Sequence, residues 1–142
     1  MSQLTSELTA DLSAMRGYLR SDGRKGIRNY LLVVYLVECA HHVAQRIAQP
    51  WQDEGVQLIG FPGCYPSDYA QRVLESICTH PNTGAVLMVS LGCEEFNRRE
   101  LKTAIEASNR PVQLLTIQAC GGTKATIARG HEWVEHQHTL LK

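Results

Sequence analysis

The sequence predicts a three-layer α/β domain, Rossmann-like or flavodoxin-like, with a mainly parallel sheet of about four strands. The first observation is that four short apolar runs alternate with four segments of helical periodicity over most of the 142 residues. Such alternation is typical of βαβ units. The second is that the runs, among them YLLVVYLV and GAVLMVSL, are continuously apolar. Continuous runs indicate strands that helices cover on both faces, which is the environment of a parallel sheet.

The elements follow in order along the chain. Residues 1–16 are interpreted as a leader, with a short helix near its end, and residues 17–142 as a single domain. Residues 17–29 combine three glycines with arginines and a lysine, which indicates a loop or short hairpin. The strands are then expected at 30–37, 56–61, 84–91 and 112–117. The helices are expected at 40–52, at 67–78 with Ser67 or Asp68 as N-cap, at 96–107, and from 123 to about 141, with a weak spot at Gly130.

The charge balance excludes some classes of partner. Lys and Arg number 14, Asp and Glu number 14, and the formal net charge is zero. Neither nucleic acid nor an anionic membrane would find a basic surface here, and no apolar stretch is long enough to span a bilayer. The lack of net repulsion favours a homo-oligomer. The N-terminus has no signal-peptide pattern, so we expect a cytoplasmic protein.

Four of the five cysteines follow predicted strands, namely Cys39, Cys64, Cys93 and Cys120. The carboxyl ends of parallel strands meet at one edge of a sheet, where such folds bind ligands, so these thiols are expected to lie near one another. They could hold iron, zinc or an iron–sulfur cluster, or they could be buried and chemically inert. Cys78 falls within a predicted helix and is interpreted as a core residue.

Other polar residues at the strand ends are weaker candidates. His41 and His42 start a predicted helix and could be acid–base groups, ligands or solvent-facing side chains. Glu94 lies where a carboxylate favours a helix N-terminus. The turn 121–123 (GGT) resembles a phosphate-binding turn, but neither G-x-G-x-x-G nor a Walker motif is present, so nucleotide binding is disfavoured. The histidines 131, 136 and 138 indicate a solvated helix face.

One longer pattern is more specific than any of these. Residues 17–30 (GYLRSDGRKGIRNY) resemble the opening of the altronate/galactarate dehydratase (altronate hydrolase) family, at its second, Rossmann-like domain. The sulfolactate sulfo-lyase large subunit is similar in the same way. Later landmarks agree in order: Val37-Glu38-Cys39, Gly63-Cys64, His80-Pro81-Asn82, Leu91-Gly92-Cys93-Glu94, Ile117-Gln118 and Gly121-Gly122-Thr123.

The resemblance implies metal-dependent elimination of water from an aldonate or aldarate, such as altronate or galactarate, to give a 2-keto-3-deoxy acid. The implied metal is iron, as Fe²⁺ or in an iron–sulfur cluster. Cys39, Cys64 and Cys93 fall on the family pattern and are the candidate ligands, whereas Cys120 does not. His41 and Glu94 are the candidate catalytic residues for the acid–base steps, and which of them is the base stays open.

The resemblance also bears on substrate and partners. The candidate substrate-binding residues are Arg24, Arg28, Asn29, Gly121, Gly122 and Thr123. The arginines and Asn29 could instead lock the entry loop onto the sheet. Enzymes of the family are much longer, so we expect this chain to be a fragment that needs the remaining dehydratase region, in cis or in trans, and to be inactive alone. The alternatives are a non-catalytic interaction domain and a thiol- or metal-sensing module.

Overall fold

The computed structural model describes residues 16–63, 66–93 and 96–141. Its sheet has the strand order β4-β3-β5-β6, and all three pairings are parallel. The predicted four-stranded parallel sheet is therefore confirmed. The strands are β3 (Tyr30–Tyr35), β4 (Val56–Gly60), β5 (Thr83–Ser90) and β6 (Val112–Thr116).

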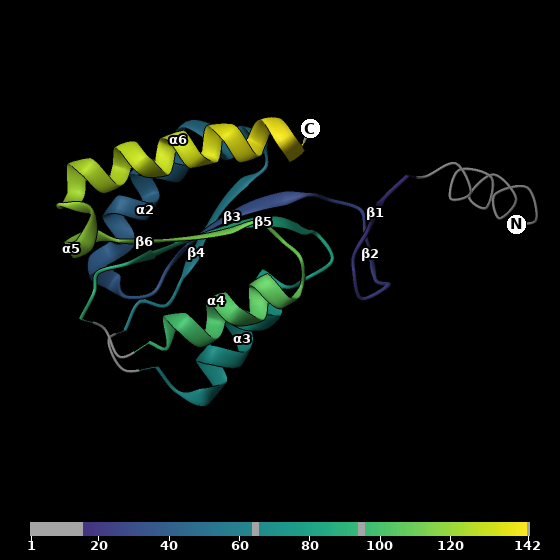
Figure 1. Cartoon of the computed structure of the whole chain (residues 1–142), viewed down its shortest axis with the longest axis horizontal. Coiled ribbons are helices and arrows are strands. Elements are labelled where there is room, and N and C mark those ends of the chain that lie inside the picture. The colour runs from purple at the N-terminus through teal and green to yellow at the C-terminus, as the bar shows by residue number, and fades with distance from the viewer. Residues whose placement is uncertain (1–15, 64–65, 94–95, 142) are drawn as a thin grey trace, which may run out of the picture.

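Helices cover both faces of this sheet and complete the three layers (Figure 1). One layer contains α2 (His41–Ala48) and α6 (Thr123–Leu141), and the other contains α3 (Asp68–Cys78) and α4 (Arg98–Ala107). Ser67 caps α3 by accepting the Ala70 N–H at 3.2 Å, as the sequence suggested. None of the described helices is long and apolar enough to cross a bilayer.

The sequence placed one helix at 40–52, where the structure has three shorter helices in succession. They are η1 (Glu38–Ala40), α2 and η2 (Gln49–Glu54). Pro50 has no N–H to donate to the carbonyl of Arg46, so the α-helical ladder ends there. His131 of α6 donates from Nε2 to that carbonyl at 2.9 Å instead. A proline thus ends one helix at the point where a neighbouring helix supplies the missing donor.

Before the sheet, residues 17–29 form the short hairpin that their glycines predict. Its strands are β1 (Tyr18–Leu19) and β2 (Lys25–Gly26), which pair antiparallel. In Figure 1 the hairpin lies at the amino-terminal end of the sheet, opposite the short helix α5 (Ile117–Cys120). These two landmarks mark the two ends of the domain.

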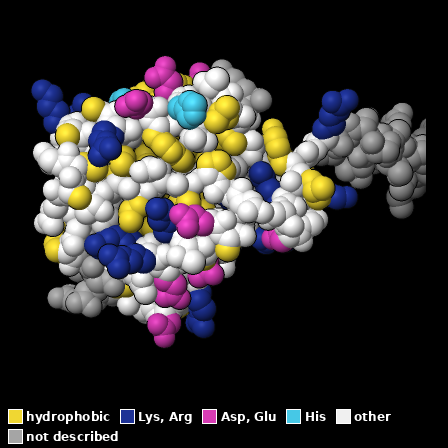
Figure 2. Space-filling model, in the orientation of Figure 1, with side chains coloured by type: hydrophobic (Ala, Val, Ile, Leu, Met, Phe, Trp, Pro, Cys, Tyr) yellow, Lys and Arg dark blue, Asp and Glu magenta, His cyan; other side chains and the backbone are white. Residues whose placement is uncertain are grey.

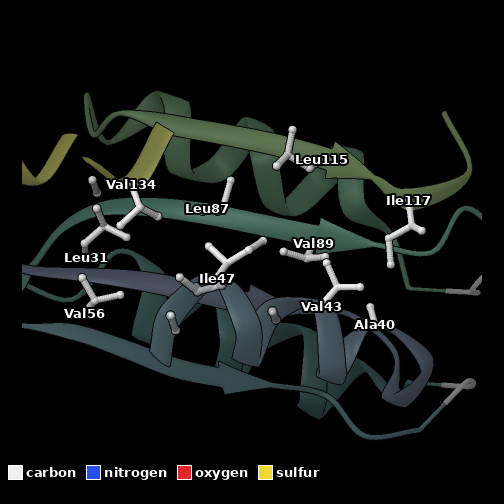
Figure 3. Close-up of a cluster of buried hydrophobic side chains, with 14 of the residues drawn as sticks. Leu31, Ala40, Val43, Ile47, Val56, Leu87, Val89, Leu115, Ile117 and Val134 are labelled. Carbon is white, nitrogen blue, oxygen red and sulfur yellow. The ribbon is translucent and has the colours of Figure 1, made fainter. Parts of the chain in front are cut away.

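Two clusters of buried side chains form the core, one on each face of the sheet. Side chains of β3 and β5 alternate between them: Leu31, Val33, Leu87 and Val89 face α2 and α6, while Val34 and Met88 face α3 and α4. Figure 3 shows Val43 and Ile47 of α2 and Val134 of α6 directed onto the first face. All eight residues of β5 are buried, which explains its unbroken apolar sequence.

Figure 2 shows acidic and basic side chains mixed on the visible face of the molecule, without a large area of one sign. Apolar side chains gather between α6 and α4, where β6 forms one edge of the sheet. Within the described residues, no strand pairs with the outer edge of β6.

Candidate functional site

The sheet reverses its winding between β3 and β5. The chain leaving β3 enters α2 on one face, and the chain leaving β5 enters α4 on the other, so the topological switch point of the sheet lies between their two carboxyl ends (Figure 1). Cys39 lies in η1, four residues after the end of β3, and Cys93 lies three residues after the end of β5. Both thiols are exposed. Two of the three cysteines that fall on the family pattern therefore flank the position where such folds bind ligands.

His41 lies at the same edge, on the first residue of α2. Its ring stacks on that of Tyr35 with centroids 4.5 Å apart and an interplanar angle of 21°. Its Nδ1 is 3.2 Å from Oε1 of Glu38. If Nδ1–H donates to this carboxylate, Nε2 keeps its lone pair, which is the form a general base needs.

The connection after β4 approaches the connection after β5. The rings of Phe61 and Phe96 contact each other with centroids 6.0 Å apart, and both pack against the α3–α4 core. Phe61 precedes Cys64 by three residues, and Phe96 follows Cys93 by three. Cys64 lies outside the described residues, but the segment leading to it starts beside the loop that carries Cys93.

The predicted metal site can therefore be assembled only in part. Glu94, like Cys64, lies outside the described residues. Across residues 16–63, 66–93 and 96–141, no three His, Cys, Asp or Glu side chains gather closely enough to hold a metal ion. Of the candidate ligands, this part of the chain supplies Cys39 and Cys93, whose sulfur chemistry suits iron. The three-cysteine ligand set stays a prediction.

The glycine turn after β6 completes this edge. Gly121 and Gly122 both have positive φ, 93° and 108°, which side chains other than glycine rarely adopt. A Cβ on Gly122 would have open space within 4 Å, so the turn leaves room above its backbone. Thr123 begins α6, and Thr126 holds the turn by donating its hydroxyl to the Gly122 carbonyl at 2.7 Å.

The predicted substrate-binding residues Arg24, Arg28 and Asn29 lie at the other end of the sheet. They belong to the hairpin and to the segment that enters β3. The six residues of β3 span about 17 Å, which separates them from the cysteines. Within this domain the structure thus divides the predicted residues into two groups, and only the carboxyl-end group shares an edge with Cys39 and Cys93.

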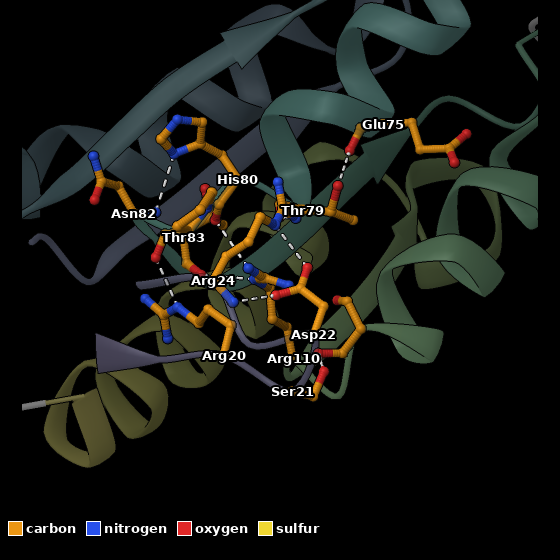
Figure 4. Close-up of polar contacts among 12 residues, drawn as sticks. Arg20, Ser21, Asp22, Arg24, Glu75, Thr79, His80, Asn82, Thr83 and Arg110 are labelled. Atoms are coloured by element: carbon orange, nitrogen blue, oxygen red, sulfur yellow. Dashed lines mark hydrogen bonds and ion pairs between the residues drawn. The ribbon is translucent and has the colours of Figure 1, made fainter. Parts of the chain in front are cut away.

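Most polar contacts of the hairpin hold it onto the sheet (Figure 4). Arg20 donates to the Pro81 carbonyl at 2.7 Å and to Oδ1 of Asn29 at 2.9 Å. Arg24 donates to Asp22 at 2.7 Å and to the Thr79 carbonyl at 2.8 Å. Arg24 and Asn29 therefore make contacts of the kind that the locking interpretation requires.

Arg110, which is only 5 % exposed, completes this arginine cluster. It donates to the carbonyls of Thr83 at 2.8 Å and His80 at 2.9 Å. Burial lowers the pKa of both Arg110 and Arg20, because a charge loses solvation there. Hydrogen bonds from the backbone and side chain of Arg24 lower the pKa of Asp22.

The two remaining cysteines have different surroundings. Cys78 is fully buried under α3, and burial raises its pKa to about 12, as expected for a core thiol. Cys120 lies in α5, with its sulfur 3.7 Å from a guanidinium nitrogen of Arg129.

Sequence reasoning assigned no role to Glu38 and Tyr35, which hold the ring of His41. The i, i+3 spacing of Glu38 and His41 was a signal for the first contact. The stacking on Tyr35 depends on how the chain turns after β3.

His138 was interpreted as solvent-facing, and this is wrong: it is 9 % exposed and bonded to the Glu54 carbonyl at 3.1 Å.

Comparison with known families agrees with this architecture. The model of the D-galactarate dehydratase/altronate hydrolase second-domain family matches residues 17–141. The chain belongs to this family. The match starts at the glycine that opens the hairpin and runs to the end of α6, so the α/β unit described above is the family's second domain.

Two curated relatives of this second domain are altronate dehydratases. The one from Bacillus subtilis (strain 168) is 28 % identical over 118 residues, which cover 73 % of this chain and 24 % of the relative. The one from Escherichia coli (strain K12) is 29 % identical over 90 residues, which cover 54 % of this chain and 18 % of the relative. The chain thus spans a quarter or less of either relative's length. No solved structure matches it.

Proposed function

We propose that this chain is the second domain of a metal-dependent sugar-acid dehydratase that eliminates water from an aldonate or aldarate. The observation that carries the proposal is the family match over residues 17–141. The geometry supports it, because exposed Cys39 and Cys93 follow the carboxyl ends of β3 and β5, where the sheet reverses its winding. Altronate and galactarate are the substrates suggested by the names of the family and its relatives. Thiols of this kind stay reduced in the cytoplasm, where we place the enzyme.

The reaction needs a base, an acid and stabilisation of negative charge. The base removes the proton α to the carboxylate, and the electron pair moves toward that carboxylate. The β-hydroxyl then leaves with a proton from the acid, so that H and OH depart as water. The remaining enol tautomerises to the 2-keto-3-deoxy acid. Iron, when bound, would supply Lewis-acid charge, with Cys39, Cys93 and Cys64 as proposed ligands.

Within the described residues, His41 is the best-placed base. Glu38 at 3.2 Å fixes its ring through Nδ1, and Tyr35 fixes the ring plane by stacking. A carboxylate on one ring nitrogen also stabilises the imidazolium that forms when the other nitrogen takes a proton. We assign the complementary acid to Glu94, which follows Cys93 directly.

The rest of the active site would come from outside this chain. The chain covers 24 % and 18 % of the two curated relatives, so most of each relative has no counterpart here. In this proposal the carboxyl-end edge of the sheet is one wall of the site, and the remaining dehydratase region, in cis or in trans, is the other. We expect the chain alone to bind metal without turning over substrate.

Iron stoichiometry after anaerobic reconstitution with Fe²⁺ tests the ligand assignment. We expect Cys39→Ser and Cys93→Ser to abolish most of the bound iron. The matched control is Cys120→Ser, which removes a thiol at the same edge of the sheet and should retain the metal. Equal iron content in all three variants would overturn the assignment.

Activity is tested in a chimera in which this chain replaces the matching domain of the Bacillus subtilis relative. Formation of a 2-keto-3-deoxy acid from altronate or galactarate is the readout. His41→Ala should lower kcat by about 10²–10⁴-fold with the fold intact, the range typical of general acid–base catalysis. An active chimera that tolerates His41→Ala and both cysteine variants would favour the non-catalytic interaction domain. The open edge of β6 is the observation that supports this alternative.

A further inference from the structure

A cavity of about 200 Å³ lies at the amino-terminal end of the sheet, away from the cysteines. Residues of four segments line it: Tyr18 of β1, Arg28 and Tyr30 at the entry to β3, Glu54 at the end of η2, and His138 on α6. Pockets for drug-sized ligands are typically about 300–1,000 Å³. This cavity suits a ligand of a few carbon atoms rather than a nucleotide or peptide.

Arg28 differs from the arginines around it. The guanidinium groups of Arg20, Arg24 and Arg110 each bond to acceptors in other segments of the chain. That of Arg28 makes a single bond, at 3.2 Å, to the carbonyl of the preceding residue, Ile27. A guanidinium has five N–H donors, so four of those on Arg28 have no acceptor among the described residues. Its fork is thus available for a carboxylate, which it can bind bidentately.

The cavity contains hydrogen-bond acceptors on Glu54 and His138 in addition to the cationic side chain of Arg28. Nε2 of His138 lies 3.1 Å from the Glu54 carbonyl and 3.5 Å from its carboxylate, and Trp51 packs against the histidine ring at 5.0 Å. This network holds the Glu54 backbone beside the cavity, while its side chain stays 56 % exposed and can accept hydrogen bonds. A cation and a carboxylate in one small cavity match a ligand with a single carboxylate and neighbouring hydroxyl groups.

We propose that this cavity is a second binding site, specific for a small hydroxy acid whose carboxylate binds Arg28 and whose hydroxyl groups face Glu54. The choice of hydroxy acid as ligand class rests on the proposed function, whereas the cavity and the uncommitted guanidinium do not. Because β3 separates the site from Cys39 by about 17 Å, an acid bound here does not reach the carboxyl ends of the strands. The site therefore binds such an acid without carrying out the elimination.

The test is a titration of the ¹⁵N-labelled 142-residue chain, followed by amide chemical shifts. The probes are D-gluconate, which is a hydroxy acid, sorbitol, which is the matching neutral polyol, and acetate, which is a carboxylate without hydroxyls. We expect saturable shifts at Leu31 and Gly55 with gluconate, and much weaker binding of the other two probes. Equal affinity for acetate would overturn the ligand class, and no saturable shift with gluconate would overturn the site.

Variants assign the effect to Arg28. Arg28→Gln should weaken gluconate binding by about 10–100-fold, the worth of charge-assisted hydrogen bonds. Arg28→Lys keeps the positive charge but lacks the forked donor geometry, so its affinity for gluconate should be intermediate. If Arg28→Gln does not fold, this lysine variant tests whether Arg28 binds the acid. Arg72→Gln, on the exposed side of α3, should leave binding unchanged.

The position of the shifts separates this inference from the proposed function. Shifts confined to Gly92, Cys93 and Gly121 would place the acid at the carboxyl end; they would overturn the second site and leave the dehydratase proposal standing. Conversely, an inactive chimera combined with Arg28-dependent gluconate binding would contradict the dehydratase proposal and leave the site standing.

Discussion

Arg110 forms a cross-link between two segments through main-chain carbonyls. It lies just before β6 and donates to Thr83, at the start of β5, and to His80, in the turn after α3. Replacing it with methionine keeps an unbranched side chain but removes both charge-assisted bonds. We expect Arg110→Met to lower the free energy of unfolding by about 2–4 kcal/mol. Urea denaturation followed by circular dichroism measures this.

The matched control for Arg110→Met is Arg72→Met, at an exposed position on α3. Surface changes of this kind are usually within about 0.5 kcal/mol of neutral. Arg110→Lys should recover only part of the stability, because an ammonium lacks the fork that reaches two carbonyls. If Arg110→Met were as stable as Arg72→Met, the two hydrogen bonds would contribute nothing measurable.

The different roles of the arginines could not be separated from the sequence. Arg20, Arg24 and Arg28 share one short motif, and an arginine suits either a substrate carboxylate or a backbone carbonyl. Which acceptor each guanidinium reaches depends on the turn at 79–82, more than fifty residues further along. Local sequence carries no signal for such a contact. His138 was misjudged for the same reason, since its partner Glu54 is 84 residues away.

At the scale of elements, Gly130 sets how closely α6 and α2 pack. The helix α6 continues through this glycine, where helical periodicity suggested a weak spot. A Cβ at position 130 would collide with the terminal methyl Cδ1 of Ile47 and lie 2.7 Å from its Cγ1, in a side chain that is fully buried. Alanine would gain about 1 kcal/mol of helix propensity but would overpack the interface by about 1–3 kcal/mol. We expect a net loss of stability on Gly130→Ala.

A double-mutant cycle with Ile47→Val isolates this contact. Valine lacks Cδ1, the Ile47 atom nearest to the added Cβ, so Gly130→Ala should cost less in that background than in the native chain. Urea denaturation of the four proteins gives the coupling energy, which should be favourable by about 0.5–2 kcal/mol. Additive effects would show that Ile47 moves aside without cost.

The strands and helices were predictable because their signals are local. Continuous apolar runs marked β3 and β5 to within two residues, and Ser67 identified the start of α3. The break in the predicted helix at 40–52 follows from Pro50, which was visible in the sequence. The donor that compensates it, His131, belongs to another helix and was not visible.

At the scale of the whole molecule, the order of the strands decides what can form one site. The alternation of strands and helices predicted that Cys39 and Cys93 share an edge, and the structure places both there. The same alternation puts residues before β3 at the opposite end. The separation of Arg28 from the cysteines could have been deduced from the predicted strand direction alone.

The rate at which the buried thiol of Cys78 is labelled reports whether the core clusters on the two faces of the sheet unfold together. Cys78 is fully enclosed between α3 and the sheet, and its pKa is raised to about 12, so a thiol reagent cannot reach a thiolate there in the native state. If opening is global, its modification should be slower than that of an unfolded chain by the unfolding equilibrium constant, about 10³-fold or more. Exposed Cys39 and Cys93 should react without this delay.

Two of the variants above distinguish global from local opening at Cys78. Arg110→Met acts on the α3–α4 side, near Cys78, whereas Gly130→Ala acts between α6 and α2, on the other face of the sheet. If the domain unfolds as one unit, each variant accelerates Cys78 labelling by the factor that its own loss of stability dictates, about tenfold per 1.4 kcal/mol. Labelling at pH 8 with a chromogenic disulfide, in a background where the other cysteines are serine, gives both rates. Acceleration by Arg110→Met alone would show that α3 opens independently of α6, and that the two core clusters are separate cooperative units.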